Sequence, residues 1–190
     1  TEANGTTFDA NGFTTASNDL FYNNGGNYVV WAWKGNGTGT AVTNESGSLD
    51  STVSANTSAG ISIINYQGNA TSGATFGHGL SSAPELVIVK NRDSTAGWVS
   101  GWTALTFEKN LVLNTTDGVG DETGQWNDTA TSSTLITLGS DLVTSGDDFI
   151  CYAFHSVDGF SRFGKYNGNG SADGDFIYTG FKPKFVIIKS

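Results

Sequence analysis

A stretch that occurs twice decides the fold of this chain. Residues 60–91 read GISIINYQGNATSGATFGHGLSSAPELVIVKN, and residues 159–190 read GFSRFGKYNGNGSADGDFIYTGFKPKFVIIKS. The two copies have equal length and share a Tyr, a Gly-Asn pair, a Phe, a Gly, a Pro and a closing Val-Ile-x-Lys segment. Such self-similarity is typical of a repeated structural unit. The matched positions are Ser62 and Ser161, Tyr66 and Tyr166, Gly68 and Gly168, Phe76 and Phe176, Gly79 and Gly180, Pro84 and Pro183, and 86–90 and 185–189.

The similarity extends upstream of each copy. Residues 28–33 correspond to residues 149–154, and residues 13–18 correspond more loosely to residues 136–141. The first copy carries an insertion at residues 34–59, where the second has only a short connection. Because loops absorb length at small free-energy cost, we expect this insertion to be a flexible excursion or a small extra hairpin.

Short segments with alternating apolar residues run through both copies. They are bounded by Gly, Asn, Asp and Ser, and such alternation predicts β-strands. Gly, Ser, Thr and Asn fill 87 of the 190 positions and form helices poorly. We therefore predict an all-β fold of two tandem, related β-sandwich or barrel modules of the jelly-roll kind, with at most single turns of helix. The expected strands are 28–33, 60–66, 85–90, 98–107, 110–113, 134–138, 148–154, 160–166 and 185–189.

The repeat divides the chain into four parts. Residues 1–12 are an N-terminal extension, and residues 13–91 are the first module, with the insertion inside it. Residues 92–133 are expected to be a β-rich connecting segment. Residues 134–190 are the second module, which we expect a neighbouring subunit to complete.

The two copies are followed by unequal lengths of chain. The segment after Lys90 can complete the first module, whereas the sequence ends at Ser190, where the second copy ends. The N-terminal extension alternates, with Thr6, Phe8 and Ala10 on one face, and is the expected donor strand for another molecule. Since donor and acceptor surfaces differ, the contact is heterologous and predicts a head-to-tail homopolymer. The expected acceptor groove is lined by Phe185, Ile187, Phe149 and Cys151.

Charge and hydropathy argue against several classes of partner. Nine Lys and Arg stand against 18 Asp and Glu, a net charge of −9, with no basic run for nucleic-acid phosphates or an anionic membrane. The apolar runs are far shorter than the roughly 20 residues that span a bilayer, so no membrane insertion is expected. The sequence has no Met, which fits either a processed mature chain or a fragment, and we expect an extracellular or virion-surface location.

Residues with catalytic or metal-binding chemistry are few. His78 lies in a Gly-rich turn, His155 follows an expected strand, and Cys151 stands alone in an apolar strand. No nucleophile elbow and no paired Cys and His spacing accompanies them. We therefore expect no enzyme activity, no metal and no cofactor.

Aromatic side chains and asparagines offer two further kinds of surface site. Trp98, Trp102, Tyr66 and Tyr166 could stack on sugar rings, although packing inside the fold is commoner for such residues. Glycans on other surfaces are thus a second expected partner. Asn-x-Ser/Thr sequons could carry glycans of their own, and plain richness in Asn and Thr explains them equally well. The sequons are at Asn4, Asn36, Asn44, Asn56, Asn69, Asn114, Asn127 and Asn169.

Three motifs carry a resemblance to a known domain. They are Phe-Asp-x-Asn-Gly-Phe-Thr at residues 8–14, Tyr-Val-x-Trp-Ala-Trp-Lys at residues 28–34, and the repeated Tyr-x-Gly-Asn with its Val-Ile-x-Lys segment. Over nearly its whole length the chain resembles a domain of unknown function associated with predicted phage tail and virion-associated proteins, often aquatic. It also resembles subunits of extracellular helical filaments built by donor-strand exchange. The resemblance implies a structural filament subunit, and the alternative is a carbohydrate-binding adhesin or tail-fibre module.

Overall fold

A computed structural model describes residues 7–15, 27, 28, 30, 32–35 and 41–190, and for Phe8 it describes the backbone alone. The chain divides into two compact units, Thr1–Trp33 and Lys34–Ser190. In the first unit, β1 (Thr7–Asp9) and β2 (Gly12–Thr14) form an antiparallel hairpin. The hydroxyl of Thr14 donates a hydrogen bond of 2.6 Å to the carboxylate of Asp9 across this hairpin.

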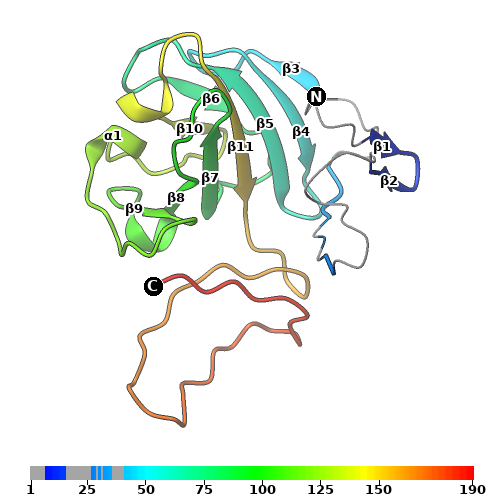
Figure 1. Ribbon diagram of the computed structural model, residues 1–190, viewed down its shortest axis with the longest axis vertical. Helices are drawn as coiled ribbons and strands as arrows, with labels where there is room; N and C mark the ends of the chain where they lie inside the picture. Colours follow the sequence, from blue (N-terminus) through cyan, green and yellow to red (C-terminus); the bar gives the residue numbers. More distant parts are fainter. Residues whose placement is uncertain (1–6, 16–26, 29, 31, 36–40) are drawn as a thin grey trace. The chain divides into compact units, whose positions relative to one another are not determined.

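A seven-stranded antiparallel sheet is the framework of the second unit. Its strands lie in the order β3-β4-β5-β11-β7-β8-β9. β11 comes last in the chain, yet it pairs on both sides, with β5 and with β7 (Figure 1). The centre of the sheet is therefore filled by a strand from far along the chain. The bounds are β3 (Val42–Asn44), β4 (Ser51–Asn56), β5 (Ile61–Gln67), β7 (Leu86–Asn91), β8 (Val99–Trp102), β9 (Asn110–Val112) and β11 (Asp148–Phe154).

A smaller layer packs on one face of this sheet. β6 (Thr75–Gly77) pairs with β10 (Leu135–Thr137), with Phe76 opposite Ile136, and both side chains are fully buried. Trp126 and Phe107 meet edge to face in the same core, with ring centroids 5.5 Å apart. Each such side chain stabilises the fold by roughly 1.5–3 kcal/mol. Three short helical turns complete the layer: η1 (Thr103–Leu105), α1 (Thr123–Trp126) and η2 (Ser140–Leu142).

Alternation along β11 decides which of its side chains enter the core. Phe149, Cys151 and Ala153 are fully buried, whereas Ile150 and Tyr152 are half-buried on the opposite face. β7 beside it shows the same alternation. Strand residues two apart share a face, so one register places every inward residue of both strands in the core.

The structure confirms the all-β class and most of the expected strands. The single-turn length of α1 also agrees with the composition, which disfavours long helices. The described residues hold one large sheet, and it draws strands from both repeats. The expected strands that the structure contains, to within one or two residues at either end, are 60–66, 85–90, 110–113, 134–138 and 148–154.

Three expected strands are wrong in whole or in part, and a fourth is not a strand at the residues that the structure describes. No residue from 162 to 190 lies in a strand, so the strands expected at 160–166 and 185–189 are absent; the bridge between Val157 and Ser161 is the last pairing. The strand expected at 98–107 ends at Trp102, because the chain turns into η1 at Thr103–Leu105, and Thr106 and Phe107 then take left-handed backbone with φ of 59° and 58°. Within 28–33, the residues that the structure describes are also outside any strand. Apolar alternation becomes a strand only where a second strand can pair with it.

The two segments outside the repeats both contribute to the sheet. The insertion at 34–59 supplies β3 and β4, which extend the sheet beyond β5. The connecting segment at 92–133 supplies β8, β9 and α1. We call residues 41–159 the sheet unit. It is built from the first copy, both of these segments, and β10 and β11 of the second module.

Candidate functional site

The chain after β11 exposes apolar side chains. Figure 1 draws it in orange to red as a long excursion without arrows, and we call residues 160–190 the C-terminal segment. Exposure is 89% for Phe176, 64% for Val186, 67% for Ile187 and 66% for Ile188. Soluble proteins rarely leave several large apolar side chains together on the surface unless the surface binds something.

The matching side chains of the first copy are all in the core. Phe76 and Val87 are 0% exposed and Val89 is 1% exposed, and they correspond to Phe176, Val186 and Ile188. The same residue types thus occupy a core in one copy and a surface in the other. The difference lies in the surroundings of the segment and not in its composition.

β11 pairs with β7, the strand of the first copy that holds Val87 and Val89. Cys151 lies opposite Val89 on one side and opposite Ile64 on the other, in the centre of the sheet. Among the described residues, no strand occupies the corresponding place in the second copy.

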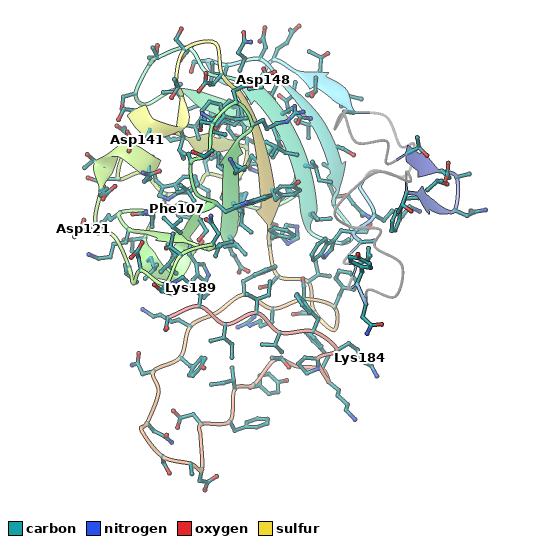
Figure 2. The ribbon with its side chains drawn as sticks, in the orientation of Figure 1. Phe107, Asp121, Asp141, Asp148, Lys184 and Lys189 are labelled. Atoms are coloured by element: carbon teal, nitrogen blue, oxygen red, sulfur yellow. The ribbon has the colours of Figure 1, made fainter. Side chains whose placement is uncertain are left out.

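The C-terminal segment contacts the sheet unit through the ring of Phe163, whose centroid lies 5.6 Å from that of Phe154, and through long charged side chains. The ammonium of Lys189 donates to the backbone carbonyl of Asp117, and that of Lys165 donates to the carbonyl of Ala104 at 3.2 Å. Figure 2 shows the side chains of this segment, with Lys184 and Lys189 labelled. Such hydrogen bonds contribute about 0.5–1.5 kcal/mol each, less than burial of the exposed apolar side chains would.

The residues expected to line an acceptor groove are not brought together. Phe149 and Cys151 are fully buried inside β11, whereas Phe185 and Ile187 lie on the C-terminal segment, 46% and 67% exposed. β11 already has a strand on each side, so its inward side chains face the core of its own sheet.

The repeat also indicates which face of residues 185–189 belongs inside. Phe185 and Ile187 correspond to half-buried residues of β7, on its outer face. Val186 and Ile188 correspond to its fully buried residues. The inward face of this segment is therefore Val186 and Ile188.

The expected donor strand is only partly described. Thr6 lies outside the described residues. Phe8 lies in β1, with its backbone opposite Phe13 of β2, and Ala10 is an exposed residue of the turn that joins them.

The aromatic residues considered for sugar stacking lie in different environments. Trp98 is 37% exposed and stacks on Tyr152, with centroids 6.2 Å apart, on the outer face of the sheet. Trp102 is half-buried, and Tyr166 on the C-terminal segment is 48% exposed. Tyr66 is buried between Phe76 and Phe149, so neither face of its ring is open to a ligand.

A shallow polar depression lies at one end of the central strands. Asp50, Asn65, Arg92 and Asp148 contribute to its rim, and Gln67 donates weakly to Asp148 at 3.5 Å. The depression does not include the exposed Trp98. It therefore offers polar side chains but no exposed aromatic ring on which a sugar could stack.

Comparison with known proteins identifies the family. The family described as Domain of unknown function (DUF7483) matches residues 1–190. The chain belongs to the DUF7483 family. No curated protein and no solved structure matches this DUF7483 chain.

The sequons of the DUF7483 chain are mostly on the surface where they are described. Asn4 and Asn36 lie outside the described residues, and Asn44 and Asn56 are half-buried. The amide of Asn56 donates to the carbonyl of Lys34 at 3.1 Å, which a glycan on that nitrogen would displace. The exposed sequons are Asn69, Asn114, Asn127 and Asn169.

His78 and Cys151 of the DUF7483 chain are buried, and His155 is half-buried. His78 is fully buried; its Nδ1 accepts a hydrogen bond from the backbone of Leu80 at 3.1 Å, and its Nε2 lies 3.3 Å from the carbonyl of Ser132. Burial lowers the pKa of His78, and burial raises the pKa of the Cys151 thiol. Among the described residues, no three His, Cys, Asp or Glu side chains gather as metal ligands, and no helix could cross a membrane.

Proposed function

We propose that the chain is a structural subunit of an extracellular or virion-surface filament, assembled head to tail by strand exchange. In this proposal the chain carries two related modules, and a neighbouring subunit completes the second. The observation that carries the proposal is the exposure of Phe176, Val186 and Ile188, whose counterparts form the core of the sheet unit. The motif resemblance and the exposed sequons support the location.

Burial of the exposed apolar side chains offsets part of the free-energy cost of association at this surface. Burying Phe176, Val186 and Ile188 would contribute roughly 1.5–3 kcal/mol each, or about 5–9 kcal/mol in all. The loss of translational and rotational freedom on association costs from about 4 to more than 15 kcal/mol. Backbone hydrogen bonds of an added strand must supply the remainder, which explains why strand exchange fits this surface better than a flat apolar contact.

Electron microscopy of matched variants tests the filament. Wild-type protein should form filaments in negative stain, and Val186→Asp should leave monomers with an unchanged near-UV spectrum. Val119→Asp is the matched control, because Val119 is 51% exposed on the sheet unit. Filaments of Val186→Asp at wild-type length, or wild-type protein that stays monomeric at high concentration, would contradict the proposal.

A separate deletion tests the donor assignment to Thr6, Phe8 and Ala10. Removing residues 1–12 should abolish filaments if that segment is the donor. Filaments that persist after the deletion would move the donor to another part of the chain.

A carbohydrate-binding adhesin or tail-fibre module is the second candidate function. It is favoured by the partly exposed pair of Trp98 and Tyr152 on the outer face of the sheet. Binding to a glycan array that disappears in Trp98→Ala would support it. Equal glycan binding by wild-type protein and Trp98→Ala would remove the reason for it.

A further inference from the structure

We propose that residues 28–33 of a second copy of this chain form the central strand of the second module, between residues 160–166 and residues 185–189. This inference rests on the proposed function and deepens it, because it names the acceptor and the register and takes residues 28–33 as the donor in place of Thr6, Phe8 and Ala10.

The place of β11 is the first argument. Residues 149–154 correspond in sequence to residues 28–33, and in the sheet they lie between β5 and β7. β5 and β7 in turn correspond to residues 160–166 and 185–189. In the first module, the strand between these two segments is residues 149–154. Residues 28–33 are therefore the expected central strand of the second module.

The side chains of the two central strands agree position by position. The inward residues of β11 are Phe149, Cys151 and Ala153, and their counterparts are Tyr28, Val30 and Ala32. An aromatic, a small branched or sulfur-containing residue and an Ala thus recur on the same face. A strand with this face fits a module whose other core residues also recur.

The register follows from the contacts of β11. Cys151 lies opposite Val89, and Ala153 lies opposite Val87. The same pairing places Val30 opposite Ile188 and Ala32 opposite Val186. These last two residues of the C-terminal segment are 66% and 64% exposed in the single chain.

The smaller layer gives an independent argument. In the sheet unit Ile136 lies opposite Phe76, and the loose correspondence upstream of each copy relates Phe13 to Ile136. Phe13 is 41% exposed in β2, and Phe176, the counterpart of Phe76, is 89% exposed. One N-terminal segment, residues 12–33, would therefore supply the missing strands of both layers.

Charge is complementary between the two ends of the chain. Residues 160–190 hold five Lys and Arg and two Asp, a net charge of +3, whereas residues 1–33 hold three acidic residues and no Lys or Arg, a net charge of −3. The rest of the chain is acidic, so the C-terminal segment is its one basic region. Opposite charges steer the N-terminal segment of one copy to the C-terminal segment of another, an attraction that salt weakens.

Disulfide cross-linking between two variants tests the register. Chains carrying Val30→Cys are mixed with chains carrying Ile188→Cys and oxidised with copper phenanthroline. Directly opposite residues in antiparallel strands have Cα atoms about 4.5–5.5 Å apart, within the range of a disulfide. Both changed positions are exposed in the single chain, and native Cys151 is fully buried, so the variants should fold and Cys151 should not compete.

The control mixture pairs Val30→Cys with Ile187→Cys. Ile187 is 67% exposed, as accessible as its neighbour, but its side chain would face the other side of the sheet. We expect at least about tenfold more covalent dimer from the first mixture, because opposite faces hold thiols beyond disulfide range. Equal cross-linking in the two mixtures, or none in the first, would overturn the inference.

A double variant separates contacts between copies from contacts within one. In the chain with both Val30→Cys and Ile188→Cys, we expect covalent chains of several copies at high protein concentration. A cross-link formed only within single chains would show that the strand comes from the same copy and would overturn the choice of a second copy.

The inference and the proposed function can fail separately. Filaments without the 30–188 cross-link would leave the proposed function standing and reject this donor. The cross-link in closed dimers without filaments would support this donor and reject the filament.

Discussion

Replacing corresponding valines in the two copies measures how far the second module is formed in a single chain. Val87 in β7 is 0% exposed, whereas its counterpart Val186 is 64% exposed. Val→Ala at a buried site loses about 1.6 kcal/mol of transfer free energy, at about 0.8 kcal/mol for each of two carbons. A residual cavity of about 40 Å³ adds about 1 kcal/mol.

We therefore expect Val87→Ala to lower the free energy of unfolding by about 2.5 kcal/mol. Val186→Ala should lower it by less than about 0.6 kcal/mol in dilute solution, because most of its surface is already in contact with water. If an added strand buries Val186, the same change should weaken assembly by about 1.5–2.5 kcal/mol, a factor of roughly 10–70 in the association constant.

The assay is urea unfolding of dilute monomer, followed by tryptophan fluorescence, to which buried Trp126 contributes, with assembly measured separately by sedimentation. Linear extrapolation with an unchanged slope gives the free energies directly. A loss for Val186→Ala in the monomer that equals the loss for Val87→Ala would refute the reasoning. It would mean that the second copy already has a packed core in the single chain.

Three further predictions concern the sheet unit. Gly101→Ala should cost about 1–3 kcal/mol, because a Cβ there would lie 2.5 Å from the Trp126 ring; Gly118→Ala, with nothing within 4 Å, should be nearly neutral in the same urea assay. Tyr66→Phe should cost about 1–2 kcal/mol, since the buried hydroxyl donates at 2.9 Å to a carbonyl of η2; a neutral result would contradict that role. Burial lowers the pKa of His78 from 6.5, so the unfolded chain takes up that proton first as pH falls. Stability is then full above about pH 6.5 and declines toward the folded pKa by up to about 1.4 kcal/mol per pH unit. His78→Asn should flatten this slope in urea titrations at several pH values, and an unchanged slope would exclude His78 as its source.

Local pattern was enough to find the strands that pair within the sheet unit. Residues 61–67, 86–91 and 148–154 carry apolar residues at alternate positions, and each is a strand in the structure. Residues 185–189 alternate as well, yet they are not a strand. Pairing is a property of two segments, so a pattern within one segment could not distinguish these cases.

The repeat alone could not predict the order of the strands in the sheet. The repeat relates residues 28–33 to residues 149–154 but says nothing of which copy each strand completes. The structure places β11 between β5 and β7, which belong to the other copy. The repeat therefore predicts an acceptor groove at Phe149 and Cys151, whereas these residues belong to an inserted central strand.

No local sequence pattern predicts that the strand ends at Trp102 either. Thr106 and Phe107 adopt positive φ, which non-glycine residues seldom do. The turn directs the Phe107 ring into the core, where it meets Trp126. The burial of both rings offsets the strain, so tertiary packing decides the local conformation here.

The pairing of β11 within one chain also indicates how strong the same contact would be between two copies. Within one chain β11 reaches its place between β5 and β7 at the effective concentration set by the chain between them, commonly millimolar. A strand from a second copy makes the same kinds of contact without that advantage, so its association depends on protein concentration. Each added copy would bring its own basic C-terminal segment for the next acidic N-terminal segment. A heterologous contact of this kind leaves one acceptor and one donor at the ends of any open assembly, and growth stops only if the rotation between copies closes a ring.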